Sequence, residues 1–409
     1  MNYIKNLIFH KLSLSNDEFK ELSSNSNIVI NNCNKSISSD KIKENNKNND
    51  VTSIQFVNRD NTINLLTYNL FLRPIVSTNG NDYKNQRVED FLDELERFDI
   101  ICFQEVFGLF NTRKTNLIYE AAKRGYYYYA EPPSPNILSV ECMDGGILII
   151  SRFHIEKIDF LPYTYGSHID AIVVKGLVYV KVRIKDTYFH LFNTHLQATY
   201  NTYTKEERVY FATRKSQIEE LALNISELLK RHYFNKTEKI LLCGDLNIDA
   251  SYNSDYSWLY GKHKSEYSYL MDQINMHDYT STNIYHYYKK EHPITYGGDD
   301  KILYHPECYN YKQSLDYIIE IKYKGDIDKN IKTINNTKSF IQKPIVIKDT
   351  RINSNINIIY DSIKVESFYL NEEAKITKNR PYNQLSDHYG LSISLNYSND
   401  NDNNNNIDT

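Results

Sequence analysis

The feature that most restricts the fold of this chain is a pattern that occurs five times, in which an apolar run of the kind that forms a buried strand ends at a short polar cluster. The strand ends of a stiff sheet can hold side chains that converge on one point. Together the clusters supply carboxylates, carboxamides and imidazoles, which suit a hard metal ion and a phosphoester. The clusters occupy residues 67–69, 104–105, 193–195, 244–247 and 385–388.

Several of the apolar runs are continuous, which predicts strands that are covered on both faces. Two segments between the runs, 86–97 and 205–231, carry apolar residues at helical spacing. We therefore expect an α/β fold, in which two packed sheets form a sandwich with helices outside. The predicted strands are 64–71, 100–105, 146–151, 177–184, 188–195, 239–246, 314–320 and 389–395.

Composition separates one patterned domain, residues 61–397, from three biased segments. Residues 1–60 are rich in Asn, Ser and Lys, which predicts a mostly disordered N-terminal arm, and residues 398–409 form a disordered Asn/Asp tail. A block at about 321–362 mixes Ile with Lys and Asn. We expect this block to insert between two core strands of the domain.

The charge and the cysteines restrict the partners and the compartment. A net charge of −4 gives no general attraction to polyanions, so nucleic acid is not an expected partner. The five cysteines form no CxxC pair and are odd in number, which predicts free thiols and a cytoplasmic protein. We expect no transmembrane segment and no signal peptide, because no apolar run has the required length or flanks. The sequence does not determine an oligomeric state.

Glu105 and Asn69 are candidate metal ligands. Glu105 follows a buried run, and a buried carboxylate is unfavourable unless it meets a cation or hydrogen-bond donors. Mg²⁺ prefers one or two carboxylates and retains several waters. The alternative for Glu105 is a helix cap or a structural ion pair, and an isolated Asn69 is more often a turn residue. Beside Glu105, Asn69 becomes a second candidate contact to the metal.

Asp245 and Asn247 are two positions apart, so in an extended chain their side chains point to one face. There Asp245 can orient a water molecule, while Asn247 donates to a phosphate oxygen. An Asx turn is the plainer interpretation of the same residues. The Gly-Asp-x-Asn arrangement after an apolar run favours the functional interpretation.

His195 and His388 are a candidate pair of catalytic imidazoles. One can stabilise developing charge on phosphorus or protonate a leaving group, while the other accepts a proton from the attacking water. A general base of this kind needs an orienting acceptor. Asp316 is the candidate that orients His388. An isolated histidine is usually structural, but two at strand ends beside acids favour catalysis.

Six motifs, in chain order, are similar to the deoxyribonuclease I-like endonuclease/exonuclease/phosphatase superfamily. The resemblance spans about residues 62–396 and implies a four-layered α/β sandwich of two mixed sheets with outer helices. Further stretches, NQRVEDF, DGGILIISRF, KGLVYVKV and HLFNTHLQA, resemble the neutral sphingomyelinase branch. The six motifs are TYNLF, FQEVF, NTHLQA, GDLNID, LDYII and LSDHYGL.

The resemblance implies a role for each candidate residue. It makes Glu105 the main Mg²⁺ ligand, with Mn²⁺ as an alternative ion. It also implies a switch that admits substrate, formed by Asp170 and Lys175, for which a structural ion pair is the alternative. The other positions match as follows: Asn69 and Asp387 beside the metal, His195 near the scissile phosphate, Asp245 and Asn247 on the water and phosphate, and Asp316 paired with the general base His388.

The activity implied is Mg²⁺-dependent hydrolysis of sphingomyelin to ceramide and phosphocholine, by in-line attack of an activated water. The partner is then sphingomyelin in a membrane, reached by peripheral contact at its surface. An aromatic hairpin precedes the Asp-His motif in bacterial relatives, whereas here that interval is the Ile/Lys/Asn block without Trp. The alternatives are a nuclease or phosphoinositide phosphatase of the same superfamily, and a non-catalytic lipid-binding module. Every expected polar position is filled, which favours an enzyme.

Overall fold

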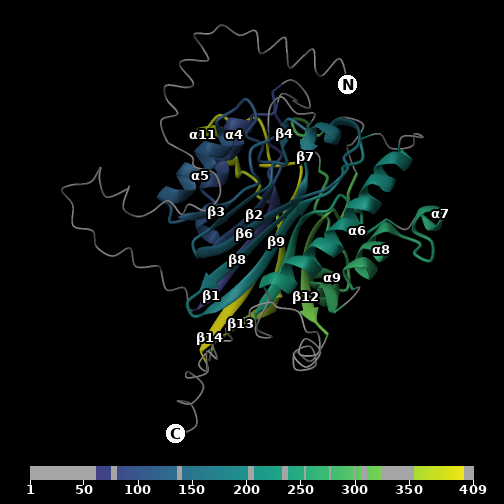
Figure 1. Cartoon of the computed structure of the whole chain (residues 1–409). Helices are drawn as coiled ribbons and strands as arrows, with labels where there is room; N and C mark the ends of the chain where they lie inside the picture. The colour runs from purple at the N-terminus through teal and green to yellow at the C-terminus, as the bar shows by residue number, and fades with distance from the viewer. Residues whose placement is uncertain are drawn as a thin grey trace. The chain divides into compact units, whose positions relative to one another are not determined.

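Two six-stranded sheets are stacked face to face in the computed structural model of the chain (Figure 1). The first sheet has the strand order β13-β14-β1-β2-β5-β3, and the second has the order β11-β12-β10-β9-β8-β6. The structure describes residues 61–74, 81–135, 141–200, 207–232, 238–252, 255–275, 278–298, 300–304, 311–324 and 354–399. All of these belong to one compact unit of the chain.

Both sheets mix parallel and antiparallel pairs. In the first, β1 is parallel to β2 and antiparallel to β14. Its strands are β1 (Thr62–Asn69), β2 (Ile100–Gln104), β3 (Tyr128–Ala130), β5 (Leu148–Ser151), β13 (Ser354–Glu366) and β14 (Gly390–Asn399). In the second, β10 is parallel to β9 and antiparallel to β12. Its strands are β6 (His154–Pro162), β8 (Gly176–Ile184), β9 (Thr187–His195), β10 (Lys239–Asp245), β11 (Tyr279–Asn283) and β12 (Asp316–Tyr323).

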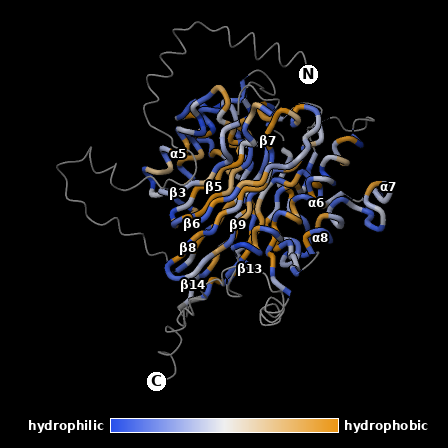
Figure 2. Tube along the Cα trace, in the orientation of Figure 1, coloured by the Kyte–Doolittle hydropathy of each residue, from blue (hydrophilic) through white to orange (hydrophobic). Residues whose placement is uncertain are grey.

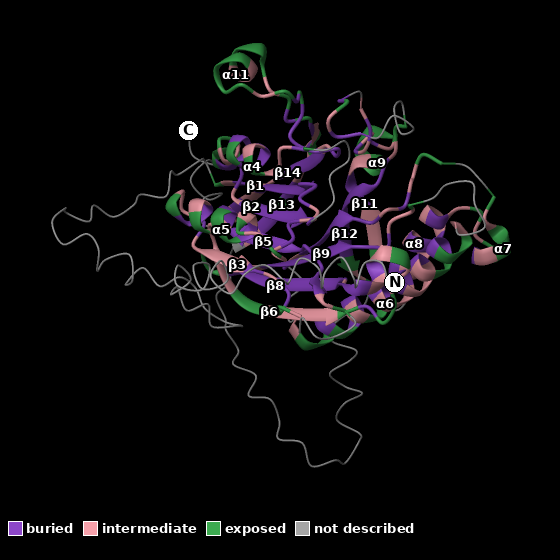
Figure 3. Cartoon of the chain, turned by 90° about the horizontal axis from the view of Figure 1, so that it is seen from above, coloured by how far each residue is buried: buried purple, intermediate pink, exposed green. Residues whose placement is uncertain are grey.

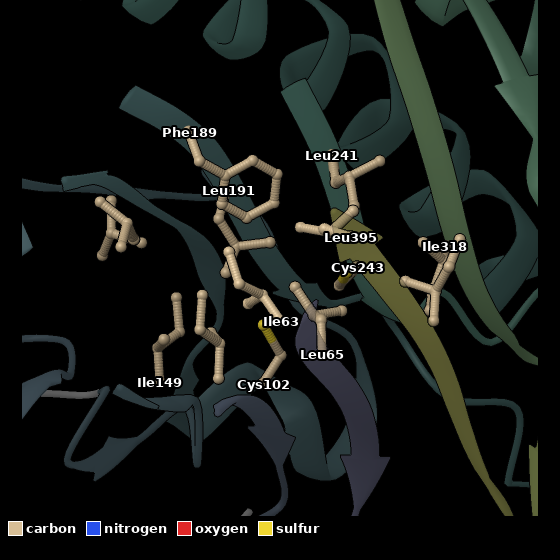
Figure 4. Close-up of a cluster of buried hydrophobic side chains, with 14 of the residues drawn as sticks. Ile63, Leu65, Cys102, Ile149, Phe189, Leu191, Leu241, Cys243, Ile318 and Leu395 are labelled. Atoms are coloured by element: carbon tan, nitrogen blue, oxygen red, sulfur yellow. The ribbon is translucent and has the colours of Figure 1, made fainter. Parts of the chain in front are cut away.

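The main apolar core lies between the sheets, because alternate side chains of each strand point inward. Leu65 and Cys102 of the first sheet meet Leu191 and Leu241 of the second, and all four are fully buried (Figure 4). Apolar residues are concentrated along the strands and are less frequent in the connections between them (Figure 2). This interior is the reason that the apolar runs of the sequence become central strands.

Helices cover the outer face of each sheet. On the first lie α4 (Lys84–Leu92), a 3-10 turn (Leu95–Arg97) and α5 (Arg113–Lys123), and on the second lie α6 (Glu207–His232) and α8 (Glu266–Ile274) (Figure 3). The order helix, sheet, sheet, helix confirms the predicted four-layered α/β sandwich. None of the described helices combines the length and the apolar composition that a bilayer span requires.

All eight predicted strands and both predicted helices are present, with shifted ends. The helix predicted over 86–97 is interrupted after Leu92 and continues as the 3-10 turn. The biased block was predicted to run to about residue 362, but β13 begins at Ser354 and its Ile356 and Ile363 pack into the core. The inserted segment is therefore shorter than predicted. Residues 1–60, 325–353 and 400–409 lie outside the described residues.

Candidate active site

The predicted site residues lie where the ends of the central strands of both sheets meet. In the second sheet, Asp245 at the end of β10 is paired with His195 of β9 on one side and Asp316 of β12 on the other. In the first sheet, Asn69 at the end of β1 is paired with Gln104, and Glu105 follows directly. The register therefore places three candidates in a row on one sheet and two on the other.

Asn69 joins the two rows. Its amide nitrogen lies 2.9 Å from Asp245 Oδ2 and 3.3 Å from Glu105 Oε1. Asp245 Oδ2 also lies 3.6 Å from Nε2 of His388, which stands just before β14. In this arrangement Asn69 holds two carboxylates through its nitrogen, and its oxygen accepts a hydrogen bond from the Phe71 N–H at 3.0 Å.

A second amide pair fixes the sheets to each other beneath the site. The Gln104 amide nitrogen donates to Asn193 Oδ1 at 2.7 Å, and the Asn193 amide donates back to the Phe103 carbonyl at 3.1 Å. Gln104 and Asn193 are both fully buried. A hydrogen bond between buried groups is geometrically demanding, so this pair sets the relative position of β2 and β9.

His388 and Asp316 form a buried hydrogen-bonded pair, with 2.8 Å between Nδ1 and Oδ2. Burial lowers the pKa of His388, but the charges of Asp316 and Asp245 outweigh it and raise that pKa to about 10. Burial and Asp316 in turn raise the pKa of Asp245 to about 6. The pair leaves Nε2 of His388 facing Asp245, and at this pKa the imidazole is protonated near pH 7.

His195 has a different environment. Its Nε2 lies 3.7 Å from Asp245 Oδ2 and 3.5 Å from the Lys175 ammonium. Burial, followed by the charges of Lys175 and His388, holds the pKa of His195 well below its usual range, so the imidazole is neutral near pH 7. Within the described part of the chain, its Nδ1 is buried without a hydrogen-bond partner.

Asp170 and Lys175 are in contact. Asp170 Oδ2 lies 2.8 Å from the Lys175 ammonium, which also donates to the Leu196 carbonyl at 2.6 Å. The Tyr200 hydroxyl donates to Asp170 Oδ1 at 2.6 Å. The pair belongs to the segment with η2 (His168–Ile172) and β7 (Val173–Val174), which pairs with β4 (Met143–Asp144). Lys175 therefore connects this segment to His195.

The expectation that Asp245 and Asn247 share one face of an extended strand is wrong. β10 ends at Asp245, and Asn247 has a φ of 52°, in the left-handed region. The Asn247 N–H donates to Asp245 Oδ1 at 2.9 Å, which is the Asx turn that the sequence also allowed. The Asn247 amide nitrogen donates to the Leu196 carbonyl at 3.1 Å, and so reaches the same carbonyl as Lys175.

The oxygen atoms around Glu105 fit a hard divalent cation. Glu105 Oε2 is buried and has no hydrogen-bond partner among the residues that the structure describes. Asp387 is only 6% exposed, and burial and the charge of Glu105 raise the pKa of its carboxyl to about 7. Two neighbouring carboxylates with little access to solvent are stabilised by a cation between them. One oxygen each of Asp245 and Asp316 and one nitrogen of His388 lie within 4.8 Å of one another as a second metal-compatible group.

Two arginines and a serine of the site were not identified from the sequence. Arg87 is fully buried and donates to four backbone carbonyls, and Ser386 Oγ donates to the Asn69 carbonyl at 2.6 Å. Arg73 lies 3.8 Å from Glu105 Oε2. The NQRVEDF stretch contains Arg87, but nothing in the pattern distinguishes a buried arginine from a surface one. The carbonyls that Arg87 reaches belong to Leu70, Phe71, Asp82 and Leu385.

The sequence and the fold of this chain are similar to those of known phosphodiesterases. A sequence profile of the Endonuclease/Exonuclease/phosphatase family matches residues 66–314. A sphingomyelinase of Dictyostelium discoideum is 28% identical over 359 residues, which cover 78% of this chain and 75% of the relative. A sphingomyelinase C of Bacillus cereus is 27% identical over 234 residues, which cover 53% of this chain and 65% of the relative.

A sphingomyelinase C 2 of Leptospira interrogans is 24% identical over 250 residues, and these cover 57% of this chain and 38% of the relative. The chain thus spans less than two thirds of the length of the two bacterial relatives. Among solved structures, beta toxin from Staphylococcus aureus is 18% identical, with a TM-score of 0.49, and the match covers 81% of this chain and 99% of that one.

Proposed function

Because the chain belongs to the endonuclease/exonuclease/phosphatase family and is a phosphodiesterase, we propose that it hydrolyses sphingomyelin to ceramide and phosphocholine. The observation that carries the proposal is the His388–Asp316 pair at 2.8 Å, placed against Asp245, which Asn69 links to the candidate cation ligand Glu105. The choice of sphingomyelin rests on the relatives from Dictyostelium and Bacillus, which carry that activity in their names.

We propose that Glu105 and Asp387 hold a Mg²⁺ ion, with Mn²⁺ as an alternative. Asn69, which the sequence predicts as a further metal contact, directs its amide nitrogen at Glu105, and we propose that it positions this carboxylate. When bound there, the ion would polarise the phosphoryl group and offset part of the negative charge that keeps the proton on His388. The unpartnered oxygen of Glu105 supports this assignment, since a buried carboxylate oxygen is unfavourable without a donor or a cation.

In the proposed reaction, His388 Nε2 accepts a proton from a water molecule as its oxygen attacks phosphorus. Asp316 keeps the proton of the imidazole on Nδ1 and stabilises the imidazolium that forms. Asp245 Oδ2 lies 3.6 Å and 3.7 Å from the two imidazoles, so it can orient the water between them. The bond from phosphorus to the ceramide oxygen breaks on the opposite side, and that oxygen takes a proton from solvent as ceramide leaves.

We propose that His195 and Lys175, which lie 3.5 Å apart, face the phosphoryl group of the substrate. A neutral His195 can donate a hydrogen bond to a phosphoryl oxygen but is a poor general acid near pH 7. The Lys175 ammonium, 3.5 Å away, adds positive charge there. We propose that Asp170 and Tyr200 position Lys175, and that the substrate switch acts by changing the contact between Asp170 and Lys175.

The decisive experiment compares three substrates with the purified chain, in the presence of Mg²⁺ and after chelation. We expect phosphocholine release from sphingomyelin vesicles that depends on Mg²⁺. Cleavage of plasmid DNA or dephosphorylation of inositol lipids without phosphocholine release would instead establish one of the alternative superfamily activities. Vesicle binding with no hydrolysis of any substrate would identify a lipid-binding module.

We further propose that the protein acts in the cytoplasm, in peripheral contact with a membrane surface. The structure records Cys102, Cys142 and Cys243 as free thiols, which is compatible with a reducing compartment. Fractionation of cells that express the chain tests this proposal. Recovery of the chain from the secreted medium would contradict it.

A further inference from the structure

Arg73 lies next to the candidate cation site, on the segment that continues from β1. The Leu70 and Leu72 N–H groups donate to the carbonyls of Gln104 and Glu105 at 3.0 and 3.1 Å, so this segment runs beside the end of β2. The Arg73 guanidinium carbon lies 4.3 Å from the centre of the Phe71 ring. The backbone and this ring together hold the guanidinium group beside Glu105.

The contact between Arg73 and Glu105 is an incomplete ion pair. Arg73 Nε and Glu105 Oε2 are 3.8 Å apart, which is too long for a hydrogen bond. Both atoms are buried, and neither has a hydrogen-bond partner among the described residues. A buried donor and a buried acceptor that face each other without bonding are both unfavourable, and they indicate that something else binds each of them.

The charges identify what these two groups bind. The oxygen of Glu105 would be satisfied by a divalent cation, which would also weaken the attraction between Arg73 and that carboxylate. The N–H of Arg73 then needs an anionic acceptor. Arginine binds phosphoryl oxygens well, because its planar N–H groups match their spacing and its charge is permanent. A phosphodiester bound at Glu105 through such a cation would present an oxygen of this kind to Arg73.

We infer that Arg73 is a catalytic residue that binds a non-bridging phosphoryl oxygen of the substrate through its unpartnered Nε–H. The inference rests on the proposed phosphodiester hydrolysis, but it does not depend on sphingomyelin as the substrate. It assigns a ligand of opposite charge to each member of the Arg73–Glu105 pair: the cation to Glu105 and the anionic phosphoryl group to Arg73. The competing interpretation is that Arg73 serves only as a counter-ion for Glu105.

Arg152 offers a matched control at the other end of β2. Its Nε lies 3.7 Å from Asp99 Oδ1, and its guanidinium carbon lies 4.4 Å from the centre of the Tyr126 ring. It shares the long carboxylate contact and the aromatic ring of Arg73, but its Nε donates to the Phe98 carbonyl at 3.3 Å, and it lies away from the site. Arg152→Gln is expected to lower stability without changing the binding of phosphate or Mg²⁺.

The test uses full-length Arg73→Gln, Arg73→Lys and Arg152→Gln. Calorimetry measures the binding of Mg²⁺ alone and of inorganic phosphate to the Mg²⁺-loaded protein. Hydrolysis of bis(4-nitrophenyl) phosphate gives kcat and KM independently of any lipid. We expect Arg73→Gln to weaken phosphate binding at least tenfold and to lower kcat/KM by about 100-fold, the scale for loss of one charge-stabilising donor. Arg73→Lys should recover part of both, and Mg²⁺ binding should remain intact or become tighter.

The outcomes separate this inference from the proposed function. If Arg73→Gln changes only Mg²⁺ affinity and leaves phosphate affinity and kcat/KM at the wild-type values, Arg73 is a counter-ion and the inference is wrong. Absence of phosphate binding by the Mg²⁺-loaded wild type also overturns it. A third result is that the wild type hydrolyses the synthetic diester, with a rate that falls in Arg73→Gln, and yet releases no phosphocholine from sphingomyelin. That result contradicts only the choice of sphingomyelin as substrate and leaves the inference about Arg73 intact.

Discussion

At the scale of single residues, two of the candidate side chains sit on backbone that is unusual for them. Glu105 and Asn247 have φ values of 56° and 52°, although neither is glycine. Such a left-handed conformation costs roughly 1–3 kcal/mol for Glu and less for Asn, and it persists only where surrounding contacts hold it. Here the Glu105 carbonyl accepts from the Leu72 N–H, and the Asn247 N–H donates to Asp245. These contacts turn both side chains toward the site directly after their strands end.

The imidazole held by Asp316 gives the first prediction. His388→Ala should lower kcat for phosphocholine release by about 10²–10⁴-fold, the usual effect of a lost general base. Asp316→Asn should cause a smaller loss, because it removes the negative charge that stabilises the imidazolium but keeps the imidazole. His154→Ala, at the far end of β6, is the control. Normal turnover of a folded His388→Ala protein would remove this residue from the mechanism.

The carboxylate of Glu105 gives the second prediction. EDTA should abolish phosphocholine release by the wild type, and added Mg²⁺ should restore it. Glu105→Gln keeps the shape of the side chain but removes its charge, so half-maximal activity should require at least tenfold more Mg²⁺. A titration of activity against free Mg²⁺ measures both. Full activity of the wild type after chelation, checked by elemental analysis, would contradict the metal assignment.

The site shows which residues a sequence pattern can identify. Glu105, Asp245 and His388 directly follow or precede apolar runs. Each is therefore recognisable in the sequence as a polar residue at the end of a buried strand. Arg73 follows the first polar cluster without such a mark, and Arg87 acts through backbone carbonyls that no sequence displays. The pattern therefore identified site residues that lie at strand ends. It missed site residues that lie on a connecting segment, such as Arg73, or on a helix, such as Arg87.

At the scale of elements, the register between neighbouring strands determines which candidate side chains lie next to one another. His195, Asp245 and Asp316 lie in one row because β9, β10 and β12 end or begin at the same level. A shift of one residue in any of these strands would turn its candidate to the opposite face. Gly244 contributes to this register, since it lets β10 approach β9 closely just before Asp245. Its φ is 147°, and an added Cβ would lie 2.0 Å from the Thr194 carbonyl oxygen.

Substitution of Gly244 gives the third prediction. Gly244→Ala should destabilise the protein by several kcal/mol, because the methyl group overlaps a backbone oxygen in addition to a backbone strain of about 1–3 kcal/mol. Gly261→Ala is the matched control, since Gly261 has a φ of 63° but an added Cβ there would meet no atom of the described residues within 4 Å. Urea unfolding measures the difference. Equal losses in the two variants would show that the approach of the strands is unimportant.

Prediction of the elements succeeded where burial was continuous. The central strands, such as β2 and β10, are apolar except at their ends and were identified from the sequence. β6 was missed, because this edge strand has largely half-buried or exposed residues and lacks a clear pattern. β13 was missed because its Ile residues alternate with Asn and Ser in a block of biased composition. Edge strands need fewer apolar residues, and so they leave a weaker pattern.

At the scale of the whole molecule, buried polar networks occur at both ends of the sandwich. Away from the candidate site, His190 is fully buried, and its Nε2 lies 2.6 Å from Glu238 Oε2. Its Nδ1 lies 2.8 Å from the Tyr179 hydroxyl, and the ring of Tyr179 stacks on His232. Lys181 also lies 3.6 Å from Glu238. This network anchors the end of α6 to the second sheet.

The fourth prediction concerns the dependence of stability on pH. Burial, opposed by Glu238 and reinforced by Lys181 and His232, lowers the pKa of His190. In the unfolded chain its pKa is about 6.5, so the unfolded state binds more protons below that pH and stability falls as pH decreases. The wild-type Tm should therefore drop between pH 7 and pH 5. His190→Gln should reduce this drop, and an identical pH profile for both proteins would contradict the assignment.

Strand β14 lies between β13 and β1 in the first sheet, although it comes last in chain order among the described strands. During translation, β1 therefore leaves the ribosome more than three hundred residues before the strand that pairs with it along one edge. His388 stands two residues ahead of β14 and arrives equally late. A nascent chain can neither complete this sheet nor assemble the candidate active site until almost all of the domain has been synthesised. Until then, the open edge of β1 must be shielded from pairing with other chains.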